Sequence, residues 1–133
     1  MKKMLIVAVA LLGLVLSGAP AQAEVDAAKT KPIVGTFVVA DRETMRVKFT
    51  KPSEIARAYD VLAGKDRAHP IGLIVYGDPE VNIDWSWHLA DTVWSEVSIE
   101  VCDGIPSDVE KHQITSDYFC PWTARLVRIE QAR

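Results

Sequence analysis

The residues best suited to chemistry in this sequence surround His88. Residues 83–90 alternate apolar and polar side chains, which predicts a strand that carries His88 on its polar face. Residues 93–102 alternate in the same way and carry Glu96 and Glu100 on their polar face. Antiparallel pairing of these two strands would bring a carboxylate to about 5 Å from the imidazole. The group could serve as an acid/base pair or as part of a metal site, or it could be an ordinary solvated sheet face.

Motifs that would assign a specific catalytic or cofactor chemistry are missing from the sequence. The three histidines, His69, His88 and His112, lack the spacing of a metal-binding helix, and there is no C-x-x-C pair. No glycine-rich phosphate loop and no nucleophile elbow is present. We therefore predict no catalytic residue, no metal ligands and no cofactor. A small metal-dependent or acid/base enzyme centred on His88, with Glu96 and Glu100, is kept as an alternative.

Four tryptophans offer large apolar surfaces. Trp85 and Trp87 share the apolar face of their predicted strand, so we expect both in the core. Trp94 and Trp122 stand near the ends of strands or loops, where they either pack in the core or form an exposed recognition patch. The candidate binding surface comprises His88, Glu96, Glu100, Trp94 and Trp122.

These side chains must be positioned by an antiparallel sheet. An apolar repeat of helical spacing follows Pro52 and ends before Gly64, which predicts one amphipathic helix. A short helix is expected at 105–112. The fold class is then α+β: an antiparallel β-sheet of about five to six strands packed by one main α-helix, with a second short helix. The expected strands are 33–40, 45–49, 71–76, 83–90, 93–102 and 124–129.

The amino terminus has the order of a Sec signal peptide. Lys2 and Lys3 precede an apolar run at 4–16, and Ala21-Gln22-Ala23 supplies the small residues of a cleavage site. The 13-residue run is shorter than the roughly 20 residues that span a membrane, so we expect no membrane span in the mature protein. Export through Sec would place the protein in the periplasm or outside the cell. The expected segments are a signal peptide at 1–23, a flexible leader at 24–32 and a single α+β domain at 33–130.

The expected mature chain is acidic. Residues 24–133 hold 13 Lys and Arg side chains against 18 Asp and Glu side chains. Nucleic-acid binding needs patches of basic side chains that displace the counterions of phosphate, so this balance argues against a nucleic-acid partner. The expected partner is an unidentified protein or small-molecule ligand.

The sequence contains two cysteines, Cys102 and Cys120. In an oxidising compartment such a pair is expected to form a disulfide, which typically stabilises a domain by about 3 kcal/mol. The alternative is a reactive thiol, which would need an activating base beside it.

Four segments carry a resemblance to a known family. They are residues 45–64, 85–89 (WSWHL), 99–103 (IEVCD) and 120–127 (CPWTARLV). Over about residues 34–129 the chain resembles the amino-terminal domain family named after the calmodulin-binding protein BP-seventy-four. The resemblance implies a pairing of Cys102 with Cys120. It implies no activity, no catalytic residue and no calmodulin binding for this domain.

The sequence favours an exported, disulfide-stabilised binding or interaction module of unknown ligand. Its contact surface would be either the polar face around His88 or the loop around Trp122. The enzyme centred on His88 is one alternative. A secreted enzyme inhibitor that presents residues 103–119 is another.

Overall fold

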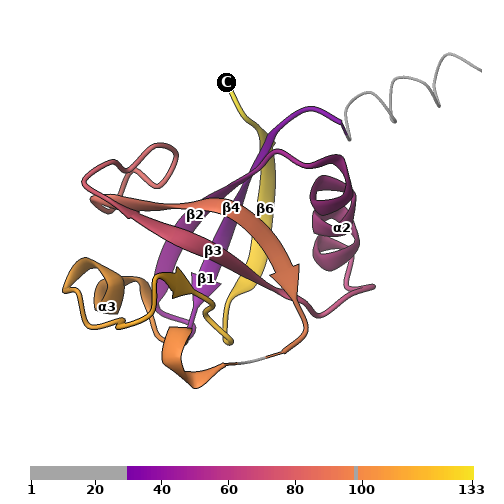
Figure 1. The fold of residues 1–133 in the computed structure, drawn as a ribbon. Coiled ribbons are helices and arrows are strands. Elements are labelled where there is room, and N and C mark those ends of the chain that lie inside the picture. Colours follow the sequence, from indigo (N-terminus) through magenta and orange to yellow (C-terminus); the bar gives the residue numbers. More distant parts are fainter. Residues whose placement is uncertain (1–29, 98) are drawn as a thin grey trace, which may run out of the picture.

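The first sheet is built on the β1–β2 hairpin and is completed by the last strand, in the order β2-β1-β6 (Figure 1). Ala40 and Asp41 have left-handed backbone angles, with φ of 51° and 53°. Such angles give a turn whose twist matches that of the two strands, so the chain reverses between the strands expected at 33–40 and 45–49. The computed structural model describes residues 30–97 and 99–133. The expected signal peptide, and the expected leader up to residue 29, lie outside them.

The described elements confirm the predicted α+β class, with one main helix and a second short helix, but they divide the strands between two antiparallel three-stranded sheets. The second sheet has the order β4-β3-β5. The elements are β1 (Ile33–Val39), β2 (Glu43–Phe49), α2 (Pro52–Leu62), β3 (His69–Tyr76), β4 (Trp87–Ser95), the 3-10 turn η1 (Glu100–Cys102), α3 (Pro106–Glu110), β5 (Tyr118–Phe119) and β6 (Arg125–Gln131).

Strand β4 replaces the two strands that were predicted at 83–90 and 93–102. Residues 83–86 form a turn, and β4 runs without interruption from Trp87 to Ser95 as the partner of β3. The polar pair Asp91-Thr92, which the sequence analysis interpreted as a break, is a bulge inside β4. Asp91 is left-handed there, with φ of 50°, and the register with β3 shifts between Ile71 and Leu73.

Gly72 makes room for this bulge. A Cβ atom at position 72 would lie 2.8 Å from the Leu89 Cβ and 2.9 Å from the Thr92 hydroxyl oxygen. Any larger residue would force the bulged strand away, so the glycine in the middle of the apolar segment 71–76 is required by the close approach of β4.

Helix α2 packs along the side of the two sheets, against β6 and β4 (Figure 1). Pro52 occupies its first turn, and Gly64 follows its end with a left-handed φ of 76°. Ile55 and Ala58 are fully buried, whereas Leu62, which was expected on the same apolar stripe, is 42% exposed. The buried stripe is thus shorter than predicted.

The core lies between the sheets and under α2. Within this core, the aromatic pair with the shortest centroid distance connects the two sheets. The Phe49 ring of β2 stacks on the Trp94 ring of β4 with centroids 4.9 Å apart. Other large side chains with almost no exposure are Trp87, Phe37, Phe119, Ile33, Met45 and Ile55. No helix among the described residues is long and apolar enough to cross a membrane.

Candidate functional site

His88 is a buried structural residue of β4. Only 8% of it is exposed. Its Nδ1 lies 2.6 Å from the Asp78 backbone oxygen, and its Nε2 lies 3.1 Å from a carboxylate oxygen of Glu80. Both neighbours are acceptors, so the ring donates to both of them only when it is protonated. The other carboxylate oxygen of Glu80 lies 3.2 Å from the Lys48 ammonium, so the cluster fastens the turn before β4 to β2.

The predicted grouping of His88 with Glu96 and Glu100 is wrong. It depended on pairing residues 83–90 with residues 93–102, but the Cα partner of His88 is Val75 of β3. Glu96 follows the end of β4, and Glu100 begins the turn η1. The polar face that would have supported an enzyme at this position is therefore not formed.

Glu96 instead contacts helix α2. Its carboxylate accepts a hydrogen bond of 2.8 Å from Arg57, whose guanidinium also donates one of 2.7 Å to Asp66. The bond to Asp66 is the main reason why the pKa of Arg57 is raised, and the same bond lowers the pKa of Asp66. This arrangement is a surface ion-pair network that ties α2 to the segments before β3 and after β4.

The two candidate recognition tryptophans have different environments. Trp94 is only 6% exposed, and its indole N–H donates to the Glu54 backbone oxygen at 2.9 Å. Its backbone N–H donates to the Glu54 carboxylate at 3.0 Å, so Trp94 joins β4 to α2 and is not available for an exposed patch. Trp122 is 52% exposed and remains available.

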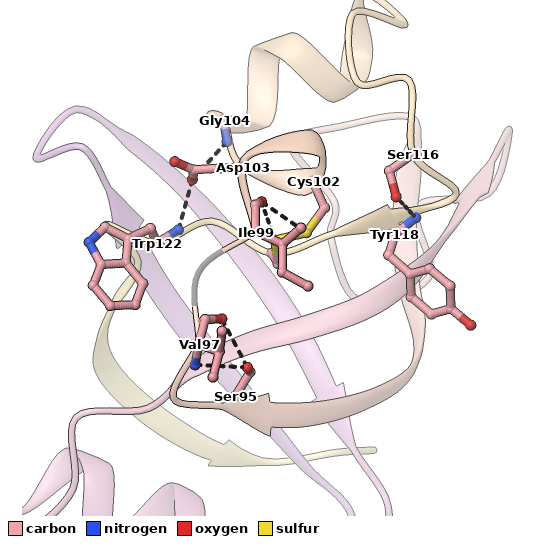
Figure 2. The surroundings of a disulfide bond; sticks show 10 residues. Ser95, Val97, Ile99, Cys102, Asp103, Gly104, Ser116, Tyr118 and Trp122 are labelled. Carbon is pink, nitrogen blue, oxygen red and sulfur yellow. Dashed lines mark hydrogen bonds between the residues drawn. A yellow bond between two sulfur atoms is a disulfide. The ribbon is translucent and has the colours of Figure 1, made fainter.

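The predicted disulfide is present and closes the segment in front of Trp122 (Figure 2). The Cα atoms of Cys102 and Cys120 are 5.1 Å apart, and the Cys120 N–H donates to the Cys102 carbonyl at 2.8 Å. The Ile99 carbonyl oxygen lies 3.4 Å from each sulfur atom. The turn η1 and the end of β5 are thus held together by both covalent and backbone contacts.

Large apolar side chains are exposed beside this disulfide. Val97 is 67% exposed and Ile99 50%, and Figure 2 shows both, together with Trp122 near the same crosslink. Val101, next to Cys102 in the sequence, is 63% exposed. We call these four residues the disulfide-loop surface. The Asp103 carboxylate accepts hydrogen bonds of 2.9 Å from the backbone N–H groups of Gly104 and Trp122, which holds the two sides of the surface together.

The sequence analysis did not identify Val97, Ile99 and Val101 as a contact surface. Their alternation was interpreted as the apolar face of a strand, whereas Val97 and Ile99 lie beyond β4 and the turn η1 follows at once. Nothing in a single sequence separates an apolar strand face from an exposed apolar loop of the same period. The adjacent Cys102 was the available signal, because a disulfide can fix a loop that has no strand partner.

The sequence analysis assigned no structural role to two further buried polar residues, Asn82 and His69. Asn82 is 1% exposed; its side-chain oxygen accepts from the Arg46 backbone at 2.9 Å and its amide donates to the Trp87 backbone at 3.0 Å. This bridge holds the turn that leads into residues 83–86, which the sequence analysis assigned to a strand. His69 is 2% exposed at the start of β3 and lies behind Trp122.

Two surface hollows lie among the described residues, and neither brings the candidate residues together. One, of about 200 Å³, is lined by Lys48, Glu80 and Asp91 among others, and another, of about 430 Å³, lies between Arg46, Ile83 and the end of β6. Neither is lined by any of the five candidate residues. Within residues 30–97 and 99–133, no group of three or more His, Cys, Asp and Glu side chains is placed to hold a metal ion.

Two small antiparallel sheets, a flanking helix and a disulfide that fixes an exposed loop define a small disulfide-crosslinked α+β domain. The chain belongs to the BP-seventy-four N-terminal domain family, whose model matches residues 33–133. This is the family that the four sequence segments resemble. Neither a curated protein nor a solved structure matches the chain.

Proposed function

We propose that this protein is an exported binding module and that the disulfide-loop surface contacts a protein partner. The observation that carries the proposal is the exposure of Val97, Ile99, Val101 and Trp122, each at least half exposed, around one crosslink. Several large apolar side chains exposed close together in the sequence and around one crosslink favour a surface that another molecule covers. An exposed tryptophan at such a place is the side chain most often found to anchor an interface.

The crosslinked loop is well suited to binding because little of it has to be ordered when a partner arrives. The disulfide fixes one end of the loop, and the Asp103 carboxylate fixes the backbone of Gly104 and Trp122. A contact surface that is rigid before binding loses less conformational entropy when the complex forms. This rigidity favours protein binding over a purely structural role for the exposed side chains.

The charges near the surface indicate the chemistry of the partner. Glu100 and Asp103 lie within the loop, while the nearby Glu96 is already paired with Arg57. An apolar surface with acidic groups within it is complementary to apolar side chains flanked by Lys or Arg. The partner we propose is therefore a protein that presents such a mixed apolar and basic surface.

Export is part of the proposal. The charged, apolar and small-residue order of residues 1–23 supports secretion through Sec, and a disulfide is typical of the compartments that secretion reaches. In such a compartment the crosslink would stay oxidised and the loop would keep its shape.

The inhibitor hypothesis assigned the contact to residues 103–119, and this segment is less suited to it. The Ser107 hydroxyl and backbone N–H both donate to the Glu43 carboxylate, at 2.7 and 2.8 Å. The Glu110 carboxylate accepts from the Ser86 hydroxyl at 2.7 Å, a bond that lowers the pKa of Glu110. Helix α3 is thereby fastened to β2 and to the turn before β4.

The test is affinity capture from the exported proteins of the source organism. The protein, purified after export, would be immobilised as wild type, as Val101→Asp combined with Trp122→Ala, and as the control Val127→Asp. Val127 is 39% exposed on β6, so the control adds the same charge to another apolar position. We expect wild type and control to retain the same proteins and the double variant to lose them, with circular dichroism showing that all three are folded. Equal capture by all three folded proteins would overturn the proposal.

A further inference from the structure

Trp122 covers a buried histidine. The His69 ring lies edge-on to the Trp122 ring, with centroids 5.2 Å apart and an angle of 72° between the planes. His69 is only 2% exposed, although Trp122 itself is half exposed. The tryptophan therefore contacts the buried histidine while about half of it remains exposed to solvent, which connects His69 to the disulfide-loop surface.

The surroundings of His69 suit a neutral ring. Its Nε2 has no hydrogen-bond partner among the described residues. A neutral tautomer can place a lone pair there, which costs less than the charged N–H that a protonated ring would place in the same buried position without an acceptor. Burial accordingly lowers the pKa of His69 below its usual value, and the Asp103 carboxylate and a hydrogen bond to the Val97 backbone offset part of this effect.

The charged and polar groups around His69 show what would move. Its partner in β4 is Ser95, which carries no charge, and Asp103 is the one charged group of the described residues that acts on it appreciably. Asp103 already accepts the Trp122 and Gly104 N–H groups. To receive a proton-bearing Nε2, the site must either admit water past the Trp122 ring or draw Asp103 away from the Trp122 backbone.

We propose that His69 is a proton-sensitive switch beneath the disulfide-loop surface: when its ring is protonated, Trp122 leaves its place and the surface changes shape. Each of these two changes displaces Trp122. Entry of water moves its side chain, and loss of the Asp103 hydrogen bond releases its backbone. The effect on partner binding rests on the proposed function, whereas the movement of Trp122 does not.

The direction of the pH dependence follows from the lowered pKa. The unfolded chain takes up the proton near the ordinary value of 6.5, and the folded chain takes it up only at lower pH. Between these two values the unfolded state binds more protons, so stability falls as the pH falls. Above about pH 6.5 the neutral ring is intact and Trp122 keeps its position.

The experiment follows the indole N–H of Trp122 by nuclear magnetic resonance from about pH 7.5 to about pH 5, with no partner present. Wild type should show a transition of the Trp122 signal with a midpoint below that of a free histidine. His69→Phe and His69→Gln should remove it, the first keeping a ring and the second keeping a polar group. His112→Gln, which changes the histidine stacked on Tyr76, is the matched control and should keep the transition.

Three results would overturn the switch. The first is a Trp122 signal in wild type that does not change over this range. The second is a transition that persists in folded His69 variants. If neither variant folds, the His69 ring carbons of wild type report the titration, and a ring that titrates without any change at Trp122 is the third. Val101→Asp separates this proposal from the binding proposal, because it should lose partner capture and still show the transition.

Discussion

His69 and His88 lie near opposite ends of strand β3, and both are buried, but their ring nitrogens face different groups. Both nitrogens of His88 face acceptors, from Asp78 and Glu80. The Nε2 of His69 faces none among the described residues. The first ring therefore has an acceptor at each nitrogen, and the second has a buried nitrogen without one. The difference distinguishes an end that is held by polar contacts from an end where, under our proposal, the cover depends on a neutral ring.

The segments that cover the two histidines also differ in how firmly they are held. At the His88 end the turn 77–82 is fixed by the buried Asn82, which joins β2 to β4. At the His69 end the cover is Trp122, half exposed and fixed through its backbone to Asp103. The second cover adjoins the exposed apolar side chains of the crosslinked loop, which is why we place the contact surface there.

The largest expected effect separates the two tryptophans that the sequence analysis treated alike. Trp94→Ala removes a stacked ring and the indole hydrogen bond to α2, so we expect a loss of about 4 kcal/mol in the free energy of unfolding. Trp122→Ala should lose about 1 kcal/mol or less, because half of its surface already contacts water. Urea unfolding near neutral pH measures both values. Similar losses would contradict the assignment of Trp94 to the core and of Trp122 to the surface.

Removal of the disulfide should act mainly on the His69 end. The cysteines are separated by 18 positions, and opening a loop of this size by Cys102→Ser with Cys120→Ser is expected to cost about 3 kcal/mol. At a temperature where the double variant remains folded, the indole signal of Trp122 should broaden or shift while the ring signals of His88 stay in place. An unchanged Trp122 signal would mean that the crosslink stabilises the domain without fixing the loop.

The smallest of these effects tests the His88 end. His88→Gln weakens the contacts with Asp78 and Glu80 and should cost about 1–2 kcal/mol, whereas the control His112→Gln should change stability by less than about 0.5 kcal/mol. Thermal unfolding of both variants with and without added Zn²⁺ gives the values. We expect no zinc-dependent stabilisation that requires His88. Zinc stabilisation of wild type that His88→Gln abolishes would restore the metal-dependent alternative.

Much of the fold was predictable because it follows from local patterns. The hairpin of β1 and β2, the helix after Pro52 and the last strand each have an unambiguous period and a turn or cap residue at their ends. The region 83–102 was predicted wrongly because its alternation of apolar and polar residues does not show which strand it pairs with. Without that partner, the alternation does not show which side chains are buried. The polar pair at 91–92 looks identical in sequence whether it separates two strands or forms a bulge in one.

The candidate site was predictable in part for the same reason. Trp122 and the disulfide were identified from residue type, and both lie at the surface that we propose for binding. The role of His69 could not be predicted, because its isolation depends on what Trp122 and the segment after β4 place around it. Grouping His88 with Glu96 required a strand pairing that does not form, and its actual partner, Glu80, lies in a turn that the sequence analysis interpreted only as a chain reversal.

The bulge at Asp91 also has a consequence for how the chain tolerates change. Before it, the odd-numbered residues Trp87 and Leu89 point into the core; after it, the even-numbered residues Thr92 and Trp94 do. One extra residue has inverted the parity of the strand midway. Removing the extra residue would restore regular alternation with Thr92 and Trp94 still facing the core, whereas the same sequence without a bulge would exchange inside for outside along everything that follows. Strand β4 thus consists of two halves whose core-facing residues are odd-numbered before the bulge and even-numbered after it.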